Sequence, residues 1–192
     1  MIFNGIEKDY LIPLTGRRRS AWAPVSRVLV TVPGMAGAYL SRTETQIREI
    51  VVPVIINAEN IEDLQKIKED MAEWLVHDEP KELIFKDEPD RVYYAVVDGE
   101  LELDEIFSTG RGEITFICAD PYKYGPEKTY EFQDSGIVEN KGTADAEPVI
   151  ELTATQKATF AMISNGTEEY NLIGTPADDD VVVVDEKTSV LY

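Results

Sequence analysis

The clearest periodic pattern along the chain predicts a helix from Ile61 to Val76. Apolar residues recur there at spacings of three and four: Ile61, Leu64, Ile67, Met71 and Leu75. That spacing places them on one face of a helix, and Trp74 borders this face. Asn60 is well suited to cap the first turn through its side-chain oxygen. The sequence therefore predicts one amphipathic helix that packs one face against a core.

Most other apolar runs have the β-branched character of strands. Two of them, residues 28–32 and 47–56, flank a Gly-rich segment with turn chemistry, and together they predict a long hairpin arm with a mobile tip. Pro53 lies inside the second run. Because proline has no N–H to donate to a strand ladder, we expect this strand to be an edge strand or to be bulged at Pro53.

Further strand-like runs follow the predicted helix in two groups. The first group comprises residues 82–85, 91–97 and 112–118. Breaker residues at 121–126 then indicate a domain boundary. The second group comprises residues 148–153, 158–163, 170–173 and 181–184. We predict a mostly β (α+β) protein: a β-sandwich-like N-terminal domain at residues 1–130 with one helix and a hairpin arm, and a partial β-sandwich at residues 131–192.

The net charge of the 192-residue chain is -19, which argues against binding to nucleic acid through a basic surface. Basic residues concentrate near the start, where residues 1–50 hold seven Lys or Arg and four Asp or Glu. The cluster Arg17-Arg18-Arg19 is either a solvated loop or a contact with an acidic surface, such as a neighbouring copy of this protein. We expect no transmembrane helix and no signal peptide, because the sequence lacks both patterns.

No constellation of residues indicates catalysis, a cofactor or a metal. The one cysteine, Cys118, lies in an apolar run and is expected to be buried. The one histidine, His77, follows the predicted helix and suits its negative end. The carboxylates of residues 87–90 could bind calcium or act as an acid–base pair, but a turn between two strands explains them better. Asp178-Asp179-Asp180 lacks the spacing of a calcium-binding loop. We therefore predict a protein that is not an enzyme.

Four stretches carry a resemblance to a known family. They are Phe3-Asn4-Gly5, residues 32–39 with a Pro-Gly-x-x-Gly turn, residues 83–95 and residues 116–125. In their order and spacing they resemble the N-terminal domain of siphophage distal tail proteins (Dit), over residues 1 to about 130. Residues 132–192 resemble the start of the family's second domain, a galectin-like β-sandwich.

The resemblance implies a structural component of a phage or prophage tail, located in the virion and assembled in the host cytoplasm. It implies a hexameric ring, a baseplate hub that joins the tail tube to the tail tip and has the tape-measure protein as a further partner. It implies no cofactor and no membrane insertion. The arm would clasp the adjacent subunit, through the predicted interface residues Val30, Val32, Pro33, Gly34, Gly37, Tyr39, Arg42 and Ile47.

Two other functions stay open at the level of sequence. One is a carbohydrate-binding β-sandwich module for host recognition, and the other is a hydrolase with scattered carboxylates. Self-association would separate the ring-forming hub from both. The arm itself favours self-association, because a two-stranded ribbon has too little core to be stable without something to pack on.

Overall fold

The chain divides into two compact units, Met1–Thr129 and Tyr130–Tyr192, in the computed structural model. The structure describes residues 1–101, 104–106, 109–133, 136–144, 146, 149–153, 160–164, 169–173 and 181–185. We refer to the first unit as unit 1 and to the second as unit 2.

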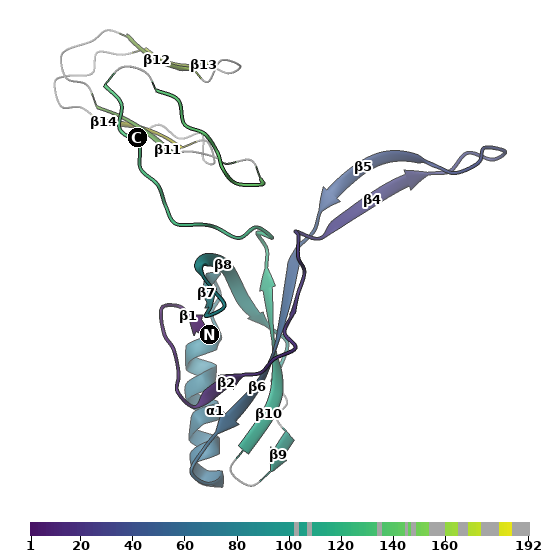
Figure 1. The fold of residues 1–192 in the computed structure, drawn as a ribbon, viewed down its shortest axis with the longest axis vertical. Helices are drawn as coiled ribbons and strands as arrows, with labels where there is room; N and C mark the ends of the chain where they lie inside the picture. The colour runs from purple at the N-terminus through teal and green to yellow at the C-terminus, as the bar shows by residue number, and fades with distance from the viewer. Residues whose placement is uncertain are drawn as a thin grey trace. The chain divides into compact units, whose positions relative to one another are not determined.

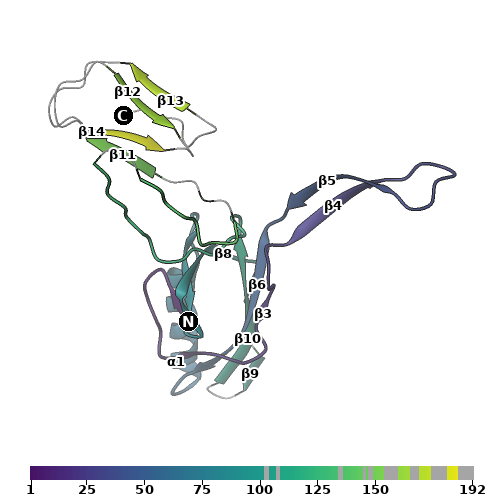
Figure 2. The ribbon, with the colours of Figure 1, turned by 45° about the horizontal axis from the view of Figure 1, so that its top comes forward.

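Unit 1 is built on one eight-stranded antiparallel sheet that curls around one side of the single helix (Figures 1 and 2). The main path of the sheet runs β1-β7-β8-β10-β6-β2, with β3 added on β6 and β9 added on β10. These strands are β1 (Ile2–Phe3), β2 (Leu11–Pro13), β3 (Arg18–Arg19), β6 (Arg48–Asn57), β7 (Lys81–Phe85), β8 (Glu88–Asp98), β9 (Asp104–Ile106) and β10 (Thr109–Cys118). The mostly β fold class with one helix is confirmed.

The core lies between the concave face of this sheet and helix α1 (Ile61–Leu75). Alternate residues of β6 are buried, as expected for a strand with one face on a core: Arg48, Ile50, Val52, Val54 and Ile56. On β10, Ile114, Phe116 and Cys118 point the same way. Phe3 joins the two layers, because its ring lies 5.5 Å from Phe116 and 6.3 Å from Trp74.

The predicted helix is confirmed almost to the residue. Asn60 caps it by accepting a hydrogen bond from the Asp63 N–H at 2.8 Å. Its inner face is buried through Leu64, Ile67, Met71, Trp74 and Leu75. Ile61 was wrongly assigned to this face, because its side chain is 59% exposed.

The arm is also confirmed as a hairpin, but its second strand was placed wrongly. The hairpin is formed by β4 (Val25–Val30) and β5 (Tyr39–Thr45). The apolar run at 47–56, predicted as the return strand, is instead the core strand β6. The error has a physical cause: β5 faces solvent and reads Tyr-Leu-Ser-Arg-Thr-Glu-Thr, so it lacks the apolar run by which buried strands are recognised.

Pro53 makes β6 neither an edge strand nor a bulged one, contrary to the prediction. β6 pairs with β10 along one side, and on the other side β2 and β3 pair with it in turn. The Pro53 carbonyl accepts a hydrogen bond from the Leu14 N–H at 2.8 Å, in the gap between β2 and β3. Because the N–H and C=O of one strand residue point to the same side, the missing N–H faces this gap. No ladder bond to β10 is lost.

Unit 2 contains two pairs of antiparallel strands among its described residues. β11 (Val149–Thr153) pairs with β14 (Val181–Asp185), and β12 (Phe160–Ser164) pairs with β13 (Glu169–Ile173). The second pair brings together the runs 158–163 and 170–173, which the sequence predicts as strands. Asp178-Asp179-Asp180 lies outside the described residues. That this unit is galectin-like stays a prediction. No helix among the described residues has both the length and the apolar character needed to cross a membrane.

Candidate assembly interface

The β4–β5 hairpin, which we call the arm, forms a two-stranded sheet of its own and projects away from the eight-stranded sheet (Figure 1). Its strands are in register from Val25 opposite Thr45 to Val30 opposite Tyr39. A bulge at Ser41 interrupts the ladder, because Val28 pairs with Arg42 whereas Leu29 pairs with Leu40. Bulges increase the local twist of a ribbon and help to prevent indiscriminate edge pairing.

The tip of the arm is shaped by a tight turn at Pro33-Gly34. The Val32 carbonyl accepts a hydrogen bond from the Met35 N–H at 3.1 Å. Gly34 has a φ of 83°, which side chains disfavour and which the third position of a type II turn requires. Proline at the second position fixes the φ that such a turn needs. The Pro-Gly-x-x-Gly segment predicted as a turn is therefore a turn.

Seven of the eight predicted interface residues lie in the arm or its tip: Val30, Val32, Pro33, Gly34, Gly37, Tyr39 and Arg42. Ile47 does not, because it lies between β5 and β6 at the base of the arm, where it is 55% exposed. The predicted set missed Leu29 and Leu40, which are 59% and 54% exposed and pair with each other. Leu29 lies in an apolar run visible in the sequence, whereas Leu40 is recognisable only from the register of the hairpin. That these residues form an interface stays a prediction.

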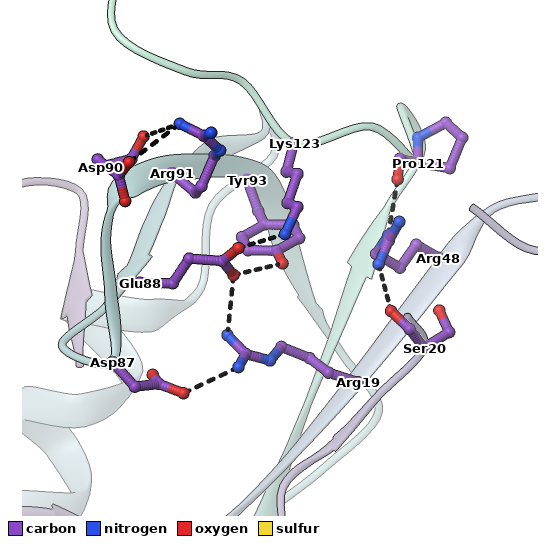
Figure 3. A network of polar contacts seen from close by, with 10 residues as sticks. All are labelled: Arg19, Ser20, Arg48, Asp87, Glu88, Asp90, Arg91, Tyr93, Pro121 and Lys123. Carbon is purple, nitrogen blue, oxygen red and sulfur yellow. Dashed lines mark hydrogen bonds and ion pairs between the residues drawn. The ribbon is translucent and has the colours of Figure 1, made fainter. Parts of the chain in front are cut away.

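A buried arginine ties the base of the arm together. Arg48, at the start of β6, is 3% exposed. Its Nε donates to the Pro121 carbonyl at 2.6 Å, and its Nη1 donates to the Ser20 carbonyl at 2.8 Å (Figure 3). Its guanidinium also lies over the Tyr93 ring, 5.6 Å from the centroid. Arg48 thus connects the chain entering the arm, the strand leaving it and the segment that follows β10.

The Arg-rich segment makes its acidic contact within the same unit. Arg19 bonds Asp87 at 2.9 Å and Glu88 at 3.4 Å (Figure 3). Arg17 also bonds Asp87, at 3.0 Å. Both guanidinium groups also lie over the Phe85 ring: that of Arg17 is 5.2 Å from the ring centroid, and that of Arg19 is 4.9 Å from it. Of the two alternatives for this cluster, an acidic contact is therefore present, but the suggested neighbouring copy is not needed to explain it.

Glu88 is the centre of this network. It contacts Arg19 and Lys123, and the Tyr93 hydroxyl donates to it at 3.2 Å. Burial alone would raise the pKa of the Glu88 carboxyl, but the hydrogen bond from Lys123 and the neighbouring positive charges lower it overall. The carboxylate is therefore held in its charged form as a structural link between β8 and the segment after β10.

The predicted acidic turn is shorter than expected. Only Lys86 and Asp87 form the turn, while Glu88, Pro89 and Asp90 belong to β8. Among the residues that the structure describes, no three His, Cys, Asp or Glu side chains group so as to hold a metal ion. Cys118 is fully buried, as predicted, and burial raises the pKa of its thiol to about 11. The His77 ring stacks on Phe3, with centroids 6.0 Å apart, so the structure shows it in a packing role.

A curled antiparallel sheet with one helix and an exposed arm defines a structural β domain with an unpartnered extension. A family model described as "phage tail protein RIFT-related domain" matches residues 7–118, the part that holds nearly all of this sheet, the helix and the arm. The chain belongs to this family of phage tail proteins.

The distal tail protein (Dit) of Bacillus phage SPP1 is similar to this chain both in sequence and in structure. The curated distal tail protein is 28% identical over 162 residues, which cover 83% of this chain and 64% of that protein. The chain thus spans less than two thirds of that relative's length. The crystal structure of SPP1 Dit, named as a paradigm of the hub adsorption apparatus in phages that infect Gram-positive bacteria, superposes with a TM-score of 0.85. It is 22% identical, and the match covers 99% of this chain and 80% of that one. The resemblance to siphophage distal tail proteins is confirmed, and the chain is related to virion tail components.

Proposed function

We propose that this protein self-assembles into a six-membered ring that forms the hub between the tail tube and the tail tip of a long-tailed phage or prophage. The observation that carries the proposal is the arm. Large apolar side chains on it, including Leu29 and Tyr39, are more than half exposed. A two-stranded ribbon is marginally stable alone, so an arm of this kind is explained by a surface of another molecule that covers it.

The description of the similar SPP1 structure supports the proposed hub. The SPP1 structure is named as a hub, and its fold extends over nearly the whole of this chain. In our proposal the ring contacts the tail tube, the tape-measure protein and the tail-tip protein. The net charge of -19 suits a ring whose channel carries DNA, because an acidic wall repels phosphates and lets the genome pass without adhering.

We propose a purely structural role, without catalysis or a cofactor. The polar networks of unit 1 support this, because their charged groups neutralise each other. Asp87 and Glu88 are paired with Arg17, Arg19 and Lys123. Carbohydrate binding by unit 2, the second function considered, stays a hypothesis.

The test is the mass of the full chain in solution, measured by light scattering at several concentrations. We expect the wild-type protein to form a discrete oligomer of six copies. An arm-less variant should remain a monomer; it replaces residues 26–44 by Asn-Gly, which can close a hairpin between the paired residues Val25 and Thr45.

Two outcomes would contradict the proposal. A wild-type protein that stays monomeric at every concentration would exclude self-assembly by this chain alone. An arm-less variant that forms the same oligomer would show that the arm is not the clasp. The arm-less variant should still fold and unfold in one cooperative transition, because the arm contributes none of the buried core residues.

A further inference from the structure

The segment that follows β10 lies along β8 and extends the sheet by one short contact. β10 pairs with β8 only over residues 96–98 of β8, so the earlier part of that edge has no partner from β10. Tyr124 pairs there with Val92 through two backbone hydrogen bonds, each of 2.9 Å. We call residues 119–125 the strap.

The strap is held without the burial of any of its side chains. Lys123 forms an ion pair with Glu88 of β8 (Figure 3). The Tyr124 ring meets the Tyr94 ring edge to face, with centroids 5.7 Å apart. Cys118, the last residue of β10, is fully buried, but every residue of the strap is at least partly exposed. Because apolar burial is the main source of stability, such a segment can detach while the core stays folded.

Arg48 ties the strap to the base of the arm. Its Nε donates to the Pro121 carbonyl in the strap, and its Nη1 donates to the Ser20 carbonyl in the chain that enters the arm. Close by in the chain, the Gln46 N–H donates to the Pro24 carbonyl at 2.8 Å and closes the base of the arm. One buried side chain therefore contacts both the strap and the base of the arm.

The ion pair that holds the strap is open to solvent. It borders a pocket of about 300 Å³ that Arg19 and Tyr93 also line. The side chain of Lys123 is 39% exposed and that of Glu88 is 24% exposed. Ion pairs in contact with water are weak and are screened by salt. The strap thus combines an ordered position with weak attachment.

We infer that the strap is releasable and that Arg48 transmits its release to the base of the arm. When the strap leaves β8, Arg48 loses the Pro121 carbonyl. A buried charge without its hydrogen-bond partner is costly, so the guanidinium moves, its bond to Ser20 weakens and the base of the arm loosens.

The position of the strap in the chain gives this device a use. The chain continues from the strap into unit 2, which begins at Tyr130. A pull on unit 2 therefore acts on the strap before it reaches the core, and Arg48 passes it to the arm. The inference concerns a movement within one chain. It goes beyond the proposed ring and does not depend on it.

Hydrogen exchange of the full chain, resolved to single residues by mass spectrometry, tests both steps. Lys123→Glu places two like charges at the contact with Glu88 and should release the strap. Exchange of the Tyr124 N–H should then rise at least about fivefold. Exchange of the Gln46 N–H, at the base of the arm, should rise with it.

The role of Arg48 is tested in an Arg48→Lys background, because lysine cannot reach both carbonyls at once. There, Lys123→Glu should still speed the exchange of the Tyr124 N–H but should no longer change that of the Gln46 N–H. Such non-additivity is expected of two side chains that act through one contact.

Two matched variants and one reference amide serve as controls. Lys123→Arg keeps the ion pair and should leave both amides as they are in the wild type. Lys8→Glu disturbs the equivalent pair of Lys8 with Asp70, outside this network, and should also leave both unchanged. The Leu64 N–H, which donates to the Asn60 carbonyl at 3.0 Å in helix α1, should exchange equally in all variants.

The outcomes separate the two steps from each other and from the proposed function. A faster Tyr124 N–H with an unchanged Gln46 N–H would overturn the transmission through Arg48. If neither amide responds to Lys123→Glu, the strap is not releasable at this ion pair. An equal rise at the Leu64 N–H would show general destabilisation and contradict both steps. All proteins are compared at one concentration, so failure here leaves the proposed ring untouched.

Discussion

Arg48 carries a permanent charge at a position that is almost fully buried, where it bonds two backbone carbonyls and lies over an aromatic ring. Burying a charge is costly unless it is hydrogen-bonded. The buried charge is tolerated because the guanidinium donates hydrogen bonds to two carbonyls, those of Ser20 and Pro121, which would lack these donors without it. At the scale of single residues, this side chain fixes where the arm leaves the sheet.

We predict that Arg48→Met lowers the free energy of unfolding by about 2–4 kcal/mol, because it removes two charge-assisted hydrogen bonds and leaves two carbonyls unsatisfied. Urea denaturation followed by tryptophan fluorescence measures the change. Arg48→Lys keeps the charge but cannot reach both carbonyls at once, so its cost should be smaller. Equal stability of Arg48→Met and the wild type would show that the bonds contribute nothing.

A second residue-scale prediction concerns acid. Hydrogen bonds from Lys8 and Tyr10 lower the pKa of the Asp70 carboxyl. A carboxyl with a lower pKa in the folded state stabilises the fold above its unfolded pKa, about 3.9. This stabilisation is lost as the pH falls through the folded value. The difference in the free energy of unfolding between the wild type and Asp70→Asn should therefore be constant from pH 5 to 7 and shrink below about pH 4. A difference that stays constant down to pH 3 would contradict this.

At the scale of elements, helix α1 and the arm show two opposite uses of apolar residues. The helix buries its apolar face in the unit that contains it, whereas the arm exposes apolar side chains on both faces. The helix therefore contributes to the stability of the monomer. In our proposal the arm contributes only after assembly.

Leu64 tests the role of the helix. It is fully buried, and Leu64→Ala should lower the free energy of unfolding by about 2–5 kcal/mol, through lost apolar burial and the cavity left behind. The matched control is Ile61→Ala on the same helix, at a position that is 59% exposed. It should change stability by less than about 0.5 kcal/mol. Similar costs for the two changes would mean that the helix is oriented differently.

At the scale of the whole molecule, the buried cluster formed by the described side chains extends from Met1 to Cys118, all within unit 1. Both ends of this stretch are anchored, because Phe3 packs on Phe116 and Met1 is 5% exposed. A domain that holds its own core can fold without the rest of its chain.

We therefore predict that residues 1–129 fold alone. Their midpoint of urea denaturation, followed by Trp74 fluorescence, should be close to the midpoint that Trp74 reports in the full chain. Trp74 is a suitable reporter because it is buried and donates to the Phe3 carbonyl at 3.0 Å. Trp22, which is 71% exposed, is replaced by Phe in both proteins so that only Trp74 is observed. A fragment that is unfolded or aggregates would show that unit 2 is needed for folding.

The elements that can be predicted without the fold are those whose signals are local in the chain. The helix from Asn60 onward follows from its period and its cap, and the tip at Pro33-Gly34 follows from turn chemistry that fixes the backbone within four residues. The burial of Cys118 follows from the apolar run around it. In each case the energetic preference lies between neighbours in the chain.

The pairing of the strands, in contrast, depends on contacts between distant parts of the chain. The apolar run of β6 belongs to the core because β10, far along the chain, pairs with it, and the polar strand β5 is a strand because β4 lies beside it. The same holds for the acidic partner of Arg19, which comes from the turn before β8, and for the two faces of the arm, which depend on the register of the hairpin. These features arise from contacts between residues distant in sequence, and no local pattern of polarity specifies them.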